Sequence, residues 1–260
     1  MVTTTLPLVT YLDSIILGII EGLTEFLPVS STGHLILATS ALGIEHTEFV
    51  KSFEIAIQLG AVFAVLALYP RSFMDLATLK KLFVAFVPTA VIGLVAYEFI
   101  KGHLIGNEMV VVCTLALGGA IMILFEYLRP PQEGSSEITY RHAVLIGIAQ
   151  SFAIVPGVSR SGATVIGGLA LGLSRTSIVE FSFLLAVPTM LAATGLDLLK
   201  SSHAFSAHEF ALLSVGFATS FFVAVIAMRA LLSFVRTRSF TVFGIYRIAL
   251  AALFFFTFLY

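Results

Sequence analysis

The chain has 260 residues, is 58% hydrophobic with a mean hydropathy of +1.05, and carries a formal net charge of −1. A soluble protein of this length has too little interior to bury so much apolar surface. The composition therefore predicts a single polytopic membrane domain over residues 1–260, in contact with the lipid bilayer. The net charge shows no overall excess of basic residues, so no nucleic-acid partner is expected. The lone cysteine, Cys113, excludes an intrachain disulfide.

Apolar stretches divide into two kinds along the chain. Six are long enough to cross a bilayer as helices: 49–69, 82–101, 108–128, 177–199, 209–234 and 240–259. Two others, 13–43 and 141–174, are apolar at both ends and interrupted in the middle by Pro, Gly and hydroxyl residues. Each half is too short to span alone, which is typical of a re-entrant helix–loop–helix hairpin. The predicted fold class is all-α integral membrane, with six transmembrane helices and two re-entrant hairpins.

The two interrupted segments also repeat each other at one constant offset, without a gap. The matched pairs are Gly18 and Gly147, Val29 and Val158, Ser30 and Ser159, and Gly33 and Gly162. Three predicted spans separate the copies, and an odd number of spans requires the second copy to be inverted. The sequence thus predicts an inverted-topology repeat with units 13–128 and 141–259.

Basic residues are distributed unevenly between the predicted loops of the two sides. One side carries Arg71, Lys80, Lys81, Arg129, Arg141, Arg175, Arg236 and Arg238, whereas the other carries Lys51, Lys101 and Lys200. Because cytoplasmic loops are enriched in Lys and Arg, the first side is predicted to be cytoplasmic. Both termini and the mouth of the 13–43 hairpin then face outward.

A pair of carboxylates opens the polar centre of the first hairpin. Glu21 and Glu25 are four residues apart, so a helix places both side chains on one face. Ionisable groups at membrane depth are costly, which favours a functional site over a chance surface pair. Two close carboxylates share either a proton or a hard divalent cation such as Mg²⁺ or Ca²⁺. Metal binding and general-base catalysis therefore both remain open for this pair.

A helix break and a hydroxyl cluster follow the carboxylates. Pro28 disfavours helix at the residue before it, so a second half-helix is expected to begin near Ser31. Its free N–H groups would form an anion site, with ordinary N-capping as the alternative role of the hydroxyls. The residues expected to contact the anion are Ser30, Thr32 and Gly33. His34, three residues after Ser31, could donate to phosphate, act as general acid, attack phosphorus or be purely structural.

The second hairpin carries Arg160 in the sequence Pro-Gly-Val-Ser-Arg-Ser-Gly. A guanidinium is always charged and forks onto two phosphate oxygens. Its neighbours are Ser159, Ser161 and Gly162. The alternative is a salt bridge from Arg160 to Glu21 or Glu25 without any ligand.

Other polar residues inside the apolar segments are less specific. Glu54 and Gln58 form an i, i+4 pair on the first full span and are candidates to line the same cavity. Glu98, Asp197 and Arg247 either lie near span ends or pair between helices, and the sequence assigns them no chemistry.

Three motifs resemble the signatures of the undecaprenyl-diphosphate phosphatase family of the bacitracin-resistance type. They are residues 18–34, 156–164 and 180–188. The resemblance implies a multi-pass enzyme of the bacterial plasma membrane with an outward-facing, divalent-cation-dependent site. It would hydrolyse undecaprenyl diphosphate to undecaprenyl phosphate and phosphate, recycling the carrier lipid for cell-wall synthesis. Residues implied to be essential are Glu21, Glu25, Ser31, His34 and Arg160. Those implied to surround the phosphates are Ser30, Thr32, Ser159 and Ser161, with Gly33 and Gly162.

Several alternatives remain at this stage. The nucleophile could be Ser31 with a Glu as base, His34, or an activated water. Inverted repeats with broken helices are also typical of transporters, so the rival function is a lipid-phosphate transporter or flippase. The partners expected in either case are a polyprenyl diphosphate lipid and the bilayer, and the sequence is compatible with a homo-oligomer.

Overall fold

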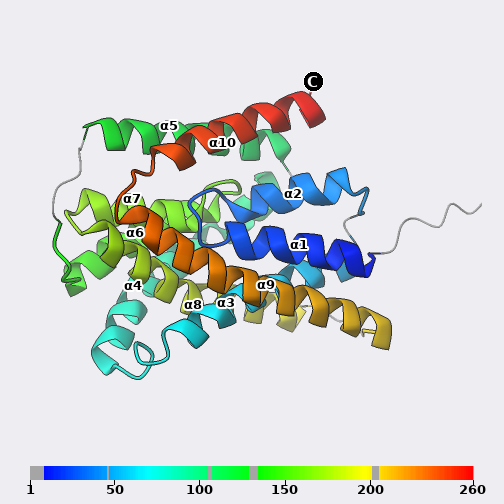
Figure 1. The fold of residues 1–260 in the computed structure, drawn as a ribbon, viewed down its shortest axis with the longest axis horizontal. Helices are drawn as coiled ribbons and strands as arrows, with labels where there is room; N and C mark the ends of the chain where they lie inside the picture. Colours follow the sequence, from blue (N-terminus) through cyan, green and yellow to red (C-terminus); the bar gives the residue numbers. More distant parts are fainter. Residues whose placement is uncertain (1–8, 46, 105–106, 129–133, 201–204, 260) are drawn as a thin grey trace, which may run out of the picture.

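A computed structural model describes residues 9–45, 47–104, 107–128, 134–200 and 205–259 (Figure 1). Within these ranges the regular structure is helical, and the sole extended contact is an isolated bridge between Ser135 and Leu173. The elements are α1 (Tyr11–Thr24), α2 (Ser31–Ala41), α3 (Glu48–Leu68), α4 (Leu76–His103), α5 (Glu108–Leu128), α6 (Tyr140–Ser151), η1 (Phe152–Ile154), α7 (Arg160–Ala170), α8 (Arg175–Lys200), α9 (Ala207–Val235), α10 (Thr241–Phe254) and η2 (Phe255–Leu259). The predicted all-α class is confirmed.

Five helices, α3, α4, α5, α8 and α9, are long and apolar enough to cross a membrane. They lie at five of the six predicted spans. The sixth predicted span, 240–259, differs because α10 has only 14 residues before the chain continues as the five-residue π-helical η2. α10 and η2 together form one continuous helical segment, residues 241–259, which is shorter than each of the five long helices. The side chains of Glu98 and Asp197 lie outside the part of the structure that is described.

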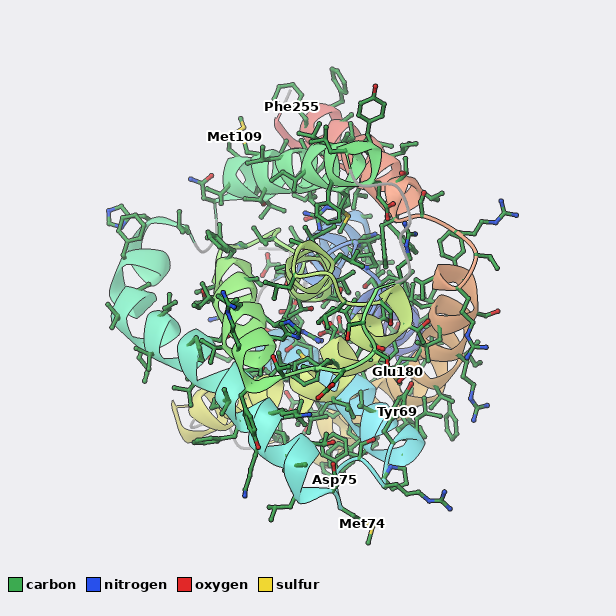
Figure 2. The ribbon with its side chains drawn as sticks, turned by 90° about the vertical axis from the view of Figure 1, so that its left-hand side faces the viewer. Tyr69, Met74, Asp75, Met109, Glu180 and Phe255 are labelled. Carbon is green, nitrogen blue, oxygen red and sulfur yellow. The ribbon has the colours of Figure 1, made fainter. Side chains whose placement is uncertain are left out.

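Large apolar side chains project outward from several of these helices. Val95 on α4, Leu117 on α5 and Phe222 on α9 are all exposed, as expected for helices whose outer faces contact lipid. The turn that carries Met74 and Asp75 lies at the opposite edge of the molecule from Met109 and Phe255 (Figure 2). The polar groups described below lie in the interior between these edges.

Both predicted hairpins form as a pair of short helices joined by a loop. α1 and α2 correspond to 13–43, and α6 and α7 correspond to 141–174. Each hairpin opens with a capping box, made by Thr10 with Asp13 in α1 and by Thr139 with His142 in α6. Pro28 lies in the loop between α1 and α2, as predicted from its effect on helices.

Each first hairpin helix packs against one long helix from the other half of the chain. α1 runs along α9, which also contacts α3, and α6 runs along α4, which also contacts α8. The remaining pair, α5 and α10, lies side by side along one edge (Figure 1). Glycines at matching positions allow the close packing: a Cβ at Gly18 would lie 2.8 Å from the Gly216 carbonyl oxygen, and one at Gly147 would overlap the backbone of Ala85.

Candidate active site

The loops of the two hairpins meet in the interior of the protein. Ser161 Oγ at the start of α7 donates a 2.8 Å hydrogen bond to the carbonyl oxygen of Leu27, in the loop after α1. Arg160 Nη2 lies 2.6 Å from Glu25 Oε1 at the end of α1. The two polar clusters of the sequence are therefore one cluster in the fold, built from both halves of the chain.

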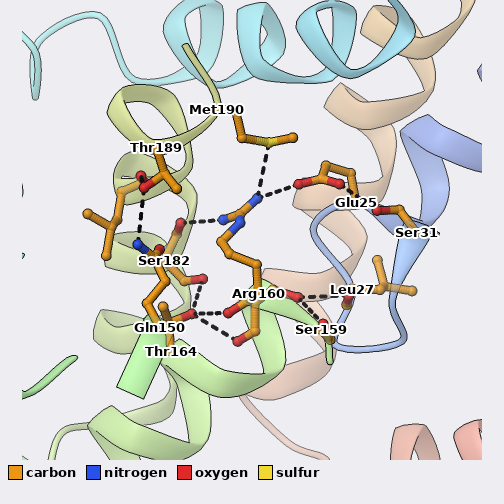
Figure 3. A network of polar contacts seen from close by, with 12 residues as sticks. Glu25, Leu27, Ser31, Gln150, Ser159, Arg160, Thr164, Ser182, Thr189 and Met190 are labelled. Carbon is orange, nitrogen blue, oxygen red and sulfur yellow. Dashed lines mark hydrogen bonds and ion pairs between the residues drawn. The ribbon is translucent and has the colours of Figure 1, made fainter. Parts of the chain in front are cut away.

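Arg160 is held from several directions (Figure 3). Its Nη1 donates to the carbonyl oxygen of Ser182 on α8 at 2.9 Å, and its Nη2 contacts Met190 Sδ at 3.8 Å. The guanidinium carbon also lies 5.8 Å from the centre of the Phe26 ring. Nε is buried without an acceptor among the described residues, so the guanidinium retains donor capacity for a ligand.

Glu25 bridges the arginine and a hydroxyl. While Oε1 faces Arg160, Oε2 accepts a 2.6 Å hydrogen bond from Ser31 Oγ. Both residues are buried. A hydroxyl that donates to a buried carboxylate is the arrangement of a nucleophile beside its general base. The salt-bridge alternative for Arg160 is thus correct in part, since Glu25 is its partner.

The residues before the two second helices differ in backbone conformation. Ser159 has φ −66° and its Oγ accepts from Gly162 N at 3.0 Å, so it is an ordinary N-cap. Ser30 has φ 71° and its side chain makes no capping hydrogen bond to α2. A non-glycine residue at positive φ costs free energy, and such residues cluster at functional sites. The N-capping alternative that the sequence left open for the hydroxyls of the first hairpin therefore fails for Ser30, and the cap at Ser159 was not predicted.

A cavity of about 120 Å³ lies where the loops meet. It is lined by Glu25, Ser30, Ser31, Thr32, Gln58, Ala153, Val158, Ser159, Arg160 and Met190. This volume exceeds several-fold the roughly 10–15 Å³ that one water molecule requires. Most of the predicted catalytic and phosphate-binding residues thus surround one space, and Gln58 lines it as expected.

Other predicted site residues lie outside this lining. Glu21 is fully buried one turn before Glu25, and neither of its carboxylate oxygens finds a donor among the described residues. Gly33 faces Leu115 on α5. Glu54, Ser161 and Gly162 are not part of the lining.

His34 does not line the cavity either. Its Nδ1 lies 2.8 Å from the carbonyl oxygen of Ser30, and its Nε2 lies 2.6 Å from the hydroxyl of Tyr246 on α10, whose ring it stacks on. A carbonyl oxygen only accepts hydrogen bonds, so Nδ1 carries the proton in this contact. A neutral His34 then accepts from Tyr246, and both ring nitrogens are engaged.

The two carboxylates fit a cation to a limited extent. Glu21 offers two buried oxygens without donors, which suits a hard divalent ion. Both oxygens of Glu25 already accept hydrogen bonds. No group of three or more His, Cys, Asp or Glu side chains with metal-binding geometry occurs in the described part of the chain. Any cation bound there would need further oxygen ligands from a substrate or water.

Comparison with known proteins decides the family. The profile of the family described as "Bacitracin resistance protein BacA" matches residues 14–253, nearly the whole chain. The chain belongs to the BacA family. Similar curated relatives carry the name "Undecaprenyl-diphosphatase". One from Aquifex aeolicus is 51% identical over 244 residues, covering 91% of this chain and 94% of the relative. One from Sulfurihydrogenibium sp. is 48% identical over 250 residues, covering 95% of this chain and 98% of the relative.

Several contacts of this BacA-family site were missed from the sequence. Tyr246 lies on a helix without a motif, so no pattern indicated it. Ser182 lies within the 180–188 motif, but its contact is made by the main-chain carbonyl, which no side-chain pattern indicates. Met190 looked like any other apolar residue. Arg247 carried a signal, because an arginine inside an apolar segment is rare without a partner or a function.

Proposed function

We propose that this protein is an undecaprenyl-diphosphatase of the bacterial plasma membrane. It hydrolyses undecaprenyl diphosphate to undecaprenyl phosphate and phosphate, and so recycles the carrier lipid for cell-wall synthesis. One observation carries the proposal. At a single cavity, Glu25 accepts a hydrogen bond from Ser31 and forms an ion pair with Arg160, so a candidate nucleophile, base and cation are in direct contact. The named relatives and the family support the same reaction.

The proposed reaction begins with the diphosphate in the cavity and the polyprenyl chain in the bilayer. Arg160 and the N–H groups at the start of α2 neutralise the phosphate oxygens. Ser31 Oγ attacks the terminal phosphorus and gives its proton to Glu25. The bond between that phosphorus and the bridging oxygen breaks, and undecaprenyl phosphate leaves. Water then hydrolyses the phosphoserine and restores Ser31.

Ser31 is favoured as nucleophile because its hydroxyl lies 2.6 Å from the carboxylate and lines the cavity. His34 has its ring nitrogens at Ser30 and Tyr246, so a direct attack by His34 would require these contacts to open. A divalent cation, Mg²⁺ or Ca²⁺, held by Glu21 and Glu25 would add charge neutralisation for the diphosphate.

The proposed membrane arrangement has six transmembrane helices and two re-entrant hairpins, related as an inverted repeat over 13–128 and 141–259. Its support is the matched packing of α1 on α9 and α6 on α4, each through a glycine at the equivalent position. The distribution of basic loops supports a site that opens outward, with both termini outside.

Phosphate release tests the activity directly. The detergent-purified protein should release inorganic phosphate from a polyprenyl diphosphate, and a chelator should suppress the release. Absence of phosphate release by folded protein, together with movement of the intact lipid diphosphate across a vesicle membrane, would favour the transporter instead.

Cysteine labelling of intact cells tests the orientation. In a Cys113→Ala background, a cysteine at Asn107 should react with an impermeant reagent, whereas cysteines at Asp75 and Thr237 should react only after lysis. External labelling at Asp75 or Thr237 would overturn the outward-facing site.

A further inference from the structure

Arg247 on α10 makes an unusual set of contacts for a buried arginine. Its side chain is among the largest fully buried ones, at 2% exposure. Its nitrogens donate to four main-chain carbonyl oxygens: Leu115 at 3.3 Å, Pro28 at 3.4 Å, Thr114 at 3.0 Å and Gly157 at 3.1 Å. It forms no salt bridge with a carboxylate of the described residues. The guanidinium therefore connects backbone segments and does not neutralise an acid.

Two of these acceptors belong to the loops that form the candidate active site. Pro28 lies two residues before Ser30, and Gly157 lies three residues before Arg160. They occupy the same position of the two hairpins, at the offset that aligns Ser30 with Ser159. No second donor to either carbonyl is found among the described residues. One side chain thus holds the equivalent carbonyl of each loop, and through Thr114 and Leu115 it fixes both to α5.

The chemistry of the side chain suits this role. A planar guanidinium has five N–H donors at fixed angles, so it can join several acceptors in one geometry, which a lysine ammonium does not reproduce. The neighbouring helix makes room for it: a Cβ at Gly118 on α5 would overlap Arg247 Nη2 and lie 2.9 Å from its Cζ. Buried carbonyls without donors are costly, so loss of Arg247 removes a restraint from both loops. The second loop keeps the hydrogen bond from Thr114 Oγ1 to the Pro156 carbonyl oxygen.

We propose that Arg247 is a positioning residue for the phosphatase reaction. It fixes the distance between the two hairpin loops, and thereby the Ser31–Glu25–Arg160 geometry. It contacts no residue of that group directly, and it acts through the backbone. This inference rests on the proposed function for its kinetic consequence, but the restraint on the loops can be measured without any activity.

Kinetics of folded variants give the first test. Arg247→Met keeps most of the volume and removes the donors, and we expect kcat to fall roughly 10–100-fold with KM changed less than about threefold, because small misplacements of reacting groups act on the chemical step. Arg247→Lys should recover little. Gly118→Ala, which displaces the guanidinium without altering it, should lower kcat in the same direction. The matched control is Gly195→Ala on α8, where an added Cβ meets nothing within 4 Å.

Chemical rescue separates position from general stability. In Arg247→Ala the deleted side chain leaves space, so millimolar guanidinium ion should restore part of kcat. The same ion should not help Arg247→Met, in which the space is filled. A folded Arg247→Met protein with the kcat and KM of the unsubstituted protein would overturn the inference.

Hydrogen exchange supplies the readout that is independent of activity. In Arg247→Met, amide exchange should increase in residues 25–30 and 152–159 and remain unchanged in α8. Faster exchange throughout the protein would indicate a purely structural role and would contradict the inference. If the unsubstituted protein releases no phosphate, the proposed function fails, and the exchange pattern still decides the role of Arg247.

Discussion

Ser31 in the first hairpin and Arg160 in the second occupy equivalent positions, and Glu25 in the first is matched by Ile154 in the second. The two hairpins share their helix–loop–helix form, their capping boxes and their packing glycines. They differ in charge: the first carries the acids and the proposed nucleophile, and the second carries the cationic Arg160. This difference in charge allows the Arg160–Glu25 ion pair, which joins the two halves.

The serines at the loop ends show a second difference. Ser159 caps α7 with an ordinary backbone, whereas Ser30 adopts φ 71° and caps nothing. The strained loop is the one that presents Ser31 to Glu25. We infer that the second hairpin is built for stability and the first for chemistry, and the variants below test that contrast.

The largest effect is expected at the nucleophile. Ser31→Ala should reduce kcat by about a thousandfold or more while substrate binding is nearly unchanged, because only a transition-state role is lost. Phosphate release and lipid binding on the same preparation measure the two quantities. Ser40→Ala, an exposed serine on the same helix, is the control.

His34→Ala in the same assay distinguishes the rival nucleophile. If Ser31 attacks, His34→Ala acts indirectly by freeing the Ser30 carbonyl, and it should retain more activity than Ser31→Ala. Measurable turnover in Ser31→Ala together with a trapped phosphohistidine would instead identify His34. Near-normal rates in both variants would remove this mechanism.

The next largest effect is expected for the cation of the second hairpin. Arg160→Lys should lower turnover by roughly 100-fold, nearly as much as Arg160→Ala, because an ammonium loses the forked geometry. Both terminal nitrogens of the guanidinium are bound, because Nη1 donates to the Ser182 carbonyl oxygen while Nη2 donates to Glu25. Retention of most activity by the lysine variant would show that charge alone is sufficient.

Sequence patterns predicted the parts of the fold that depend on local signals. The five long helices, the break at Pro28 and the two hairpins follow from apolar length and proline position. The predicted span 240–259 corresponds to α10 and η2 together, and the change to π-helical hydrogen bonding at Phe255 follows from no pattern in the sequence. The meeting of Arg160 with Glu25 was open as an alternative. The orientation of His34 toward Tyr246 was not predictable, because it depends on where α10 packs.

A smaller effect is expected for Glu21, the buried acid whose carboxylate accepts no hydrogen bond from the described residues. Glu21→Gln keeps the shape and removes the charge, so it should raise the Mg²⁺ concentration for half-maximal activity about tenfold if Glu21 binds the cation. The second hairpin already has Gln150 at this position, where its amide donates to Thr89 and Thr189. Glu137→Gln, at an exposed acid before α6, is the control. An unchanged Mg²⁺ dependence in Glu21→Gln would exclude a metal-binding role for that carboxylate.

The smallest expected effects are on the stability of the protein, and they should have opposite signs at the two equivalent serines, Ser159 and Ser30. Ser159→Ala removes the N-cap of α7 and should destabilise the protein by about 1 kcal/mol. Ser30→Gly relieves a positive φ at a residue that caps nothing, so it should leave stability unchanged or raise it by up to about 1 kcal/mol. Thermal unfolding in one detergent measures both, and phosphate release shows whether the relaxed loop still presents Ser31. A stability loss in Ser30→Gly as large as that in Ser159→Ala would mean that the two loops are equivalent, and the division between a stable and a chemical hairpin would be wrong.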